Sequence, residues 1–358
     1  MSVSNFNFKG VKCVEYIKEI DINEAIIHIL DTNGDEPILN NFVLELSDEI
    51  YAFLLKHIRK CLNDEELKYA VFKSERNIVK EVSQEFLNGN NNLIDTSSEL
   101  ARQLFILMKS KGNIPSADLI VVSMFTEYGP MLAILKMDYI KNYTHTVDFI
   151  ENKVGINIIP QFIGLPGNSQ RVQKCAFIKI INEENSFDLM VLDKKKKTKE
   201  NDNYGSNYFL DNFLGCNTIN NERDNTKKFY TTVEKWTREN FEENADKAEK
   251  IRTAVRKKLK EENEINLKDF SKEIFEEDKY VNDKFIQFSK EQGVSDKVKI
   301  DKEWAQKKLK RTRLKIDNDI DLYINEDVYH DNSRFEIKRN GDGSIDIVLK
   351  HIKNYIEK

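Results

Sequence analysis

The sequence predicts an α+β fold, in which an N-terminal antiparallel sheet with flanking helices precedes a C-terminal helical region closed by a three-strand β-meander. Three observations support this prediction. Residues 117–139, the densest apolar stretch, form two extended runs around a Gly-Pro pair, as expected for a hairpin at the centre of a sheet. Residues 208–313 repeat apolar side chains every three or four positions, whereas residues 314–349 alternate apolar and polar ones.

The first predicted domain covers residues 1–203. Helices are expected over 46–61, with Ser47 as N-cap, and over 99–111, capped by Ser97 or Ser98 and ended by Gly112. Because neither run of the central hairpin alternates cleanly, both faces of the sheet should be covered. Further short strands are expected over residues 144–150, 156–160, 173–181 and 187–192. The polar, lysine-rich segment 193–203 is interpreted as a loop at the domain boundary.

The second predicted domain covers residues 204–358. The spacing of its apolar residues predicts six helices, over 208–214 with Gly215 as its stop, 226–241, 245–260, 266–275, 281–292 and 302–313. Asp301 is the expected N-cap of the last one. The meander is expected from the alternating runs 314–324, 335–339 and 345–349, with Asn-Gly-Asp-Gly as the turn between the last two.

Composition restricts the classes of function. The chain has 358 residues, 33% of them charged, and a formal net charge of -5, so a site for a polyanion would have to be a local patch. The first ten residues lack the apolar core of a signal peptide and no run is long enough for a membrane span, so we expect a cytoplasmic protein. The four cysteines and five histidines are scattered, and we expect neither a metal nor a cofactor.

Positive charge concentrates in two stretches that both read as helical. Residues 247–260 and 302–315 each contain seven Lys or Arg against one Glu. Such helices are often merely solvated, but the second stretch crowds its cations beside Trp304 and includes two forked arginines, which suits phosphate. The first candidates for contact with a polyanion are Lys307, Lys308, Lys310, Arg311, Arg313 and Lys315, and the second are Arg252, Arg256, Lys257 and Lys258.

An enzymatic alternative uses the C-terminal strands. Glu336 and Lys338, with Asp317, Asp319 and Asp321, resemble the D…ExK pattern of metal-dependent nucleases, in which two carboxylates hold the metal and the lysine supports the attacking water. The spacing is loose and the pattern is common in charged hairpins. The sequence has no glycine-rich phosphate loop, no G-x-S-x-G motif and no credible Cys/His pair, so we expect no enzymatic activity.

The order of several segments resembles the YejK/NdpA family of bacterial nucleoid-associated proteins. The similar segments are INEAIIHILD (22–31), PMLAILKMDY (130–139), LPGNSQRVQKCAFIKI (165–180), YFLDNFLGC (208–216) and EINLKDFSKEIF (264–275). The lysine-rich loop at 193–203 is a departure. The resemblance implies a cytoplasmic, nucleoid-located, DNA-associated protein without established catalysis, and provides no motif for individual DNA contacts.

We therefore expect binding of double-stranded DNA with low sequence specificity, through the basic C-terminal helices. A homodimer is expected because nucleoid proteins commonly dimerise, and no small-molecule substrate is evident. A more distant similarity to DNA-binding subunits of Kiwa-type phage defence favours an effector or sensor acting on DNA as an alternative. A third alternative is an interaction protein that binds a protein partner through an apolar surface.

Overall fold

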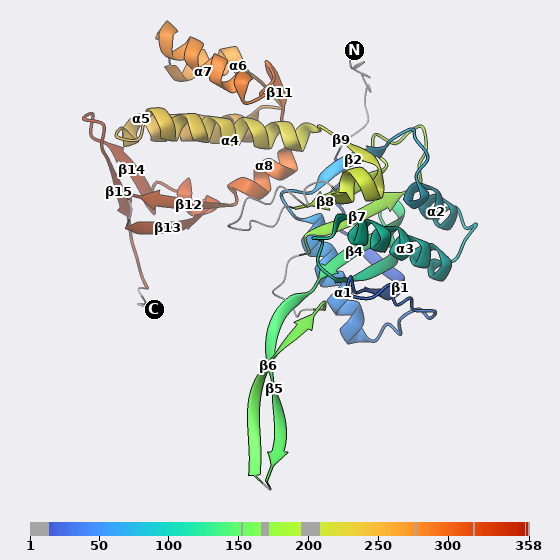
Figure 1. Cartoon of the computed structure of the whole chain (residues 1–358). Coiled ribbons are helices and arrows are strands. Elements are labelled where there is room, and N and C mark those ends of the chain that lie inside the picture. Colours follow the sequence, from blue (N-terminus) through green and yellow to red (C-terminus); the bar gives the residue numbers. More distant parts are fainter. Residues whose placement is uncertain are drawn as a thin grey trace. The chain divides into compact units, whose positions relative to one another are not determined.

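The computed structural model describes residues 14–151, 153–165, 172–194, 208–275, 278–317, 319–354 and 356 (Figure 1). The chain divides into two compact units, Met1–Ile219 and Asn220–Lys358. The boundary predicted at residue 203 lies outside the described residues. The π-helix η1 (Tyr208–Leu214) and strand β9 (Cys216–Ile219) both belong to the first unit, because η1 packs in its core and β9 pairs with its sheet.

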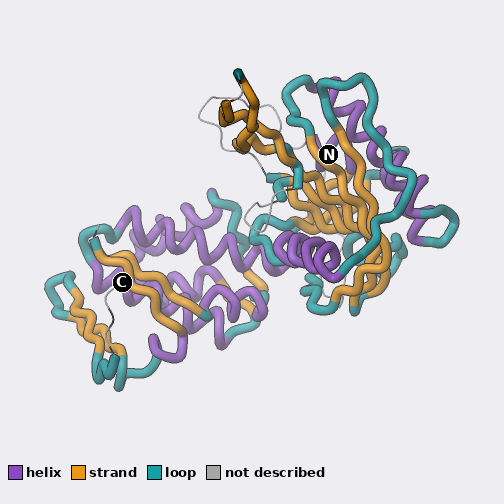
Figure 2. The backbone as a smooth tube through the Cα atoms, turned by 90° about the horizontal axis from the view of Figure 1, so that it is seen from below, coloured by secondary structure: helices purple, strands orange, loops and turns teal. Residues whose placement is uncertain are grey.

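The first unit is built on a seven-stranded antiparallel sheet, which Figure 2 shows in orange among the purple helices. The central hairpin is confirmed, with Thr126 paired to Gly129 at its turn. The strand order is β1-β3-β4-β7-β8-β2-β9. The strands besides β9 are β1 (Ile20–Leu30), β2 (Lys68–Phe72), β3 (Ala117–Thr126), β4 (Gly129–Asp138), β7 (Lys174–Lys179) and β8 (Leu189–Asp193).

Both faces of this sheet are covered, as the continuous apolar runs predict. One core contains Val121 and Ile134 from the sheet, packed with α2 (Ile78–Leu87), α3 (Leu93–Lys111) and η1. The other contains Ile120 and Leu135, packed with α1 (Asp48–Leu62). Successive residues of one strand thus enter opposite cores, so almost every position of β3 and β4 is buried.

The helix ends follow local capping chemistry. Ser47 caps α1 as predicted, and Gly112 ends α3 with φ of 73°. The predicted start of α3 is wrong by six residues, because Asn92 accepts a hydrogen bond from the Asp95 N–H at 2.9 Å and begins the helix at Leu93. Ser97 instead lies inside the helix, buried against His28 of β1.

Strands β5 (Ile140–Ile150) and β6 (Lys153–Ile163) form a separate two-stranded sheet, which projects from the first unit in Figure 1. They are longer than the two short strands predicted over residues 144–150 and 156–160. We call this hairpin the arm.

The second unit is a helical bundle with an aromatic core. Phe229, Trp236, Phe270, Phe285 and Trp304 are buried there together. Asp301 caps α8 as predicted by accepting from the Trp304 N–H at 2.9 Å. The helices are α4 (Glu222–Asn240), α5 (Ala245–Glu261), α6 (Leu267–Phe275), α7 (Lys279–Glu291) and α8 (Lys302–Leu309), accompanied by the short pair β10 (Glu264–Asn266) and β11 (Lys297–Lys299).

The predicted three-strand meander is wrong. The run 314–324, which reads as one strand, folds back on itself as β12 (Arg311–Ile316) and β13 (Ile320–Asn325), with Asp317 at φ of 44° entering the turn. Helix α9 (Glu326–Tyr329) then separates this pair from β14 (Phe335–Arg339) and β15 (Ile345–Leu349), which form a sheet of their own. A tight turn between two alternating strands keeps the alternation in phase, so the pattern alone does not reveal the turn.

Candidate nucleic-acid interface

The first predicted set of basic residues spans the end of a helix and a strand. Because α8 ends at Leu309, the predicted helix over 302–313 is wrong at its C-terminal end, and Arg311, Arg313 and Lys315 lie on β12. Alternate residues of a strand share one face, so these three cations form a row along the strand, and all three are exposed. We call this row, together with Lys307, Lys308, Lys310 and Tyr323, the basic ribbon.

An exposed tyrosine stands in the middle of the row. Tyr323 of β13 is the register partner of Arg313, and the guanidinium carbons of Arg311 and Arg313 each lie 5.3 Å from the centroid of its ring. Stacking on one ring orders two long side chains that would otherwise be free to rotate. The Arg311 side chain is thereby ordered and exposed, as phosphate recognition requires, whereas the Arg313 guanidinium also bonds to an acid of β13.

The opposite face of the ribbon is anchored to the bundle. Thr312 and Ile324 are register partners, and both are buried. Arg256 of α5 donates a hydrogen bond to the Thr312 hydroxyl at 2.6 Å, and its guanidinium lies 4.6 Å from the centroid of the Tyr329 ring. Arg256, predicted as a DNA contact, is therefore engaged in holding the ribbon.

Acidic residues reduce the positive charge of the basic ribbon around Arg313 and Lys315. Asp321 accepts two hydrogen bonds from Arg313, at 3.1 and 3.2 Å, and is the register partner of Lys315. The Arg313 hydrogen bonds, and then the charges of Arg313 and Lys315, lower the pKa of the Asp321 carboxyl. The surplus of positive charge counted along residues 302–315 is thus smaller in the folded hairpin, because β13 brings acids beside β12.

The half of the basic ribbon next to α8 combines a paired lysine with exposed cations. Lys307 pairs with Glu303 at 3.3 Å, and the Lys308 ammonium lies 5.8 Å from the centroid of the Tyr230 ring. Lys310 follows α8 as its C-cap and is exposed beside Arg311. Lys310 and Arg311, adjacent and both exposed, are therefore the cations of the basic ribbon best placed to meet a polyanion.

The second predicted set, on α5, is mostly committed to internal ion pairs. Arg252 donates two hydrogen bonds to Glu234, both at 3.0 Å, and Lys258 bonds to Glu262 and Glu273 at 2.5 and 2.8 Å. Burial alone would raise the pKa of Glu234, but the hydrogen bonds and charges of its two arginine partners outweigh it and lower that pKa. Lys257 is exposed on the outer side of the helix.

The residues of the nuclease alternative are not gathered into one site within the described ranges. Glu336 of β14 pairs with Lys350, and Lys338 is the register partner of Asp346. Asp321 is bound to Arg313, in the other sheet. Among the residues that the structure describes, no group of three or more His, Cys, Asp or Glu is placed to hold a metal ion.

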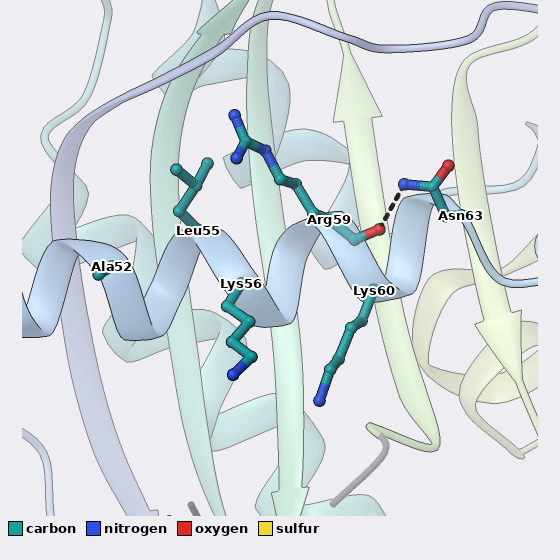
Figure 3. A pocket seen from close by; sticks show the side chains of 6 residues that line it. All are labelled: Ala52, Leu55, Lys56, Arg59, Lys60 and Asn63. Carbon is teal, nitrogen blue, oxygen red and sulfur yellow. Dashed lines mark hydrogen bonds between the residues drawn. The ribbon is translucent and has the colours of Figure 1, made fainter. Parts of the chain in front are cut away.

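The sequence reasoning missed a second basic patch, on α1 of the first unit. Lys56, Arg59 and Lys60 are exposed around a shallow hollow that Ala52, Leu55 and Asn63 complete (Figure 3). The side chains of Lys56 and Lys60 extend in the same direction, one helical turn apart, and Asn63 donates to the Arg59 carbonyl at 2.9 Å. Three cations within five residues were the available signal.

A packed histidine supports the α1 patch from beneath. His57 is 2% exposed, and its ring lies edge-on to Phe53 with 4.6 Å between centroids. Burial, and then the charges of Lys60 and Lys56, lower the pKa of His57. The imidazole is thus part of the core, as its position on the apolar face of the helix predicts. The positive charge of the patch comes from the exposed lysines and arginine beside it.

The chain is thus an α+β protein whose second unit presents a row of exposed cations on a strand pair anchored to a helical bundle. The comparison with protein families is more specific: the family model described as nucleoid-associated protein YejK matches residues 26–357. The chain belongs to this family and is thereby a nucleoid-associated protein. A comparison with curated proteins found no match. None of the described helices is long and apolar enough to cross a membrane.

Proposed function

We propose that this nucleoid-associated protein binds double-stranded DNA with low sequence specificity, through the basic ribbon and without cleaving the DNA. The observation that carries the proposal is the row of exposed cations on one face of β12, ordered by Tyr323 and anchored from behind by Arg256. A two-stranded ribbon is narrow enough to follow a groove of the duplex while its cations reach the phosphates. Membership in a nucleoid-associated family supports DNA as the polyanion.

Phosphate contacts make a quantitative prediction. If about five cations of the ribbon each neutralise one phosphate, the log–log dependence of the binding constant on salt has a slope of about -4.5 per copy. Affinity should be similar on unrelated duplexes, because phosphates contain no sequence information. Fluorescence anisotropy with two unrelated duplexes over a salt series measures both properties, and a salt-independent complex would contradict the proposal.

The contacts are tested with a charge-matched pair of variants. Lys310→Gln with Arg311→Gln removes two ribbon cations and should weaken binding on all sequences alike, while reducing the magnitude of the slope by about two. Lys268→Gln with Lys272→Gln removes two exposed cations of α6 and is the control for net charge. Equal losses from the two double variants would show that the ribbon is not the binding surface.

The α1 patch provides a second test of location. Lys56→Gln with Arg59→Gln removes two exposed cations of the first unit. If the ribbon is the principal surface, this double variant changes the slope by less than the Lys310 and Arg311 variant does. The reverse order would move the principal contact to α1.

Binding without cleavage is tested separately. Supercoiled plasmid incubated with the protein and Mg²⁺ or Mn²⁺ should remain supercoiled. Nicking that is lost in both Glu336→Ala and Lys338→Ala would establish the nuclease alternative. We also propose that the functional unit is a homodimer, because two ribbons on one particle bind DNA with an avidity that one ribbon lacks.

A further inference from the structure

The arm has one face that is largely apolar and an opposite face that is more polar. Register partners in an antiparallel pair lie on the same face of the two strands. On one face of the arm, Tyr143 pairs with Pro160, His145 with Ile158, Val147 with Ile156, and Phe149 with Val154. The next pair towards the base, Lys141 and Phe162, shares this face. The opposite face is more polar: its pairs include Asn142 with Gln161, Thr146 with Asn157 and Asp148 with Gly155, together with Thr144 and Ile159 and, at the base, Ile140 and Ile163.

The apolar face is uncovered. Its seven large apolar side chains expose between 49% and 78% of their surface, and they are Tyr143, Val147, Phe149, Val154, Ile156, Ile158 and Phe162. A two-stranded hairpin with nothing packed on it is at best marginally stable in water. An arm of this length therefore gains stability when a partner covers its apolar face. A contiguous apolar patch of this kind marks an interaction site.

We infer that the apolar face of the arm is the surface on which a second copy of this chain docks, with the two arms packed face to face about a two-fold axis. The area fits this occupant. With about 150–230 Å² for each fully exposed residue, the seven side chains present roughly 850 Å² per copy, and two facing copies would bury ~1,700 Å², the size of a standard stable interface.

Charge also fits a second copy. In a two-fold interface each surface meets itself, so a charged face would place like charges together. Lys141, at the base of the arm, is the only Lys, Arg, Asp or Glu among the described residues of the apolar face. When two arms pack antiparallel, the base of one lies at the tip of the other. The two Lys141 ammonium groups are then separated by the length of the arm.

Face-to-face packing is favoured over addition of a strand at the outer edge of β6. Pro160 has no N–H to donate, and a proline inside a strand is tolerated where its nitrogen faces away from the paired neighbour. The outer edge of β6 therefore lacks one donor, three residues before the strand ends at Ile163, which disfavours pairing with another strand there. The apolar face has no such interruption, because Pro160 contributes carbon atoms to it.

Two adjacent substitutions on β6 test the inference. Ile158→Asp places a carboxylate in the centre of the apolar face, whereas Asn157→Asp places the same group one residue away on the opposite face. Light scattering on a sizing column, without DNA, should give twice the chain mass for the wild type and for Asn157→Asp. Ile158→Asp should raise the dissociation constant of the dimer by about 100-fold or more, because each interface contains two buried carboxylates.

Several outcomes would overturn the inference. These are a wild-type protein of single-chain mass at high protein concentration, an Ile158→Asp variant that remains dimeric, or a wild-type chain that floats with neutral phosphatidylcholine vesicles through this face.

A second variant avoids any doubt about folding: a two-residue Asn-Gly turn replaces residues 141–162 and joins the register partners Ile140 and Ile163. It should be a monomer with an unchanged thermal transition of the first unit, and a dimer without the arm would contradict our assignment. The inference rests on the proposed homodimer: a dimer that persists without the arm would refute the arm as the interface but not the homodimer. Because mass is measured without DNA, the result is independent of the proposed DNA binding.

Discussion

Replacing Asp321 by Asn should make the protein bind DNA more tightly. Asp321 accepts both hydrogen bonds of the Arg313 fork and faces Lys315 across the ribbon. The asparagine has nearly the same shape but no charge, so Arg313 becomes available to a phosphate and a repulsive carboxylate disappears. Substitutions that damage a fold seldom improve binding, which makes a gain a sharper test of the ribbon than a loss.

The magnitude follows from one additional phosphate contact. Each neutralised phosphate adds about -0.9 to the log–log salt slope, so its contribution is a factor of about eight at 0.1 M salt relative to 1 M. We therefore expect Asp321→Asn to bind about eightfold more tightly at 0.1 M salt, with the advantage vanishing towards 1 M. Anisotropy titrations over that range measure the affinity and the slope together.

The matched control is Asp283→Asn, on the exposed side of α7, which changes net charge by the same amount. Its affinity should rise by much less than that of the ribbon variant. If Asp321→Asn leaves the slope unchanged, or if the two variants gain equally, Arg313 does not contact phosphate and the ribbon assignment is refuted.

Three further predictions concern stability. His28 accepts from the Asn40 N–H at 3.1 Å and contacts the Ser97 hydroxyl at 2.9 Å, and burial, then Arg102, lowers its pKa to about 4. As the pH falls, His28 takes up a proton in the unfolded chain before it does so in the folded protein, and this favours unfolding. The free energy of unfolding should therefore fall by about 2 kcal/mol between pH 8 and pH 5 because of His28. In denaturant titrations, the unfolding free energy of His28→Asn should depend less on pH by that amount. Lys136→Met should cost about 3–5 kcal/mol by leaving the buried Asp138 carboxylate without its main partner, and adding Asp138→Asn should recover part of the loss in urea unfolding. Arg256→Met should destabilise the second unit by about 1–2 kcal/mol, because it removes the hydrogen bond to Thr312 and the stacking on the Tyr329 ring. Urea unfolding measures this loss as well.

Much of the first unit could be predicted because its signals are local. The apolar runs around Gly129 and Pro130 specify the central hairpin, and Ser47 and Gly112 mark helix ends by their own chemistry. The start of α3 was missed because Asn92 and Ser97 are both good caps, and only packing against β1 shows that Ser97 is interior. Non-local pairing is invisible to such reasoning.

The candidate site was predicted by composition but not by geometry. The basic segment that ends with Lys315 was found, yet Arg311 was placed on a helix, and the acids of β13 were not set against it. The role of Arg256 depends on a neighbour 56 residues away, Thr312, which no spacing rule connects. The α1 patch was overlooked because its cations are interleaved with the buried face that defined the helix.

The order of strands in the large sheet has a consequence for how the chain folds during synthesis. Strand β2 lies between β8 and β9, and Lys68 pairs with Val191 while Phe72 pairs with Cys216. When β2 leaves the ribosome, neither of its neighbours yet exists, and more than a hundred residues must follow before the ladder can form. Long-range pairing of this kind is slow and leaves a strand edge open in the meantime. The early hairpin of β3 and β4 can form while β2 waits, so the nascent chain should acquire its sheet from the centre outwards, with the edge formed by β9 closing last.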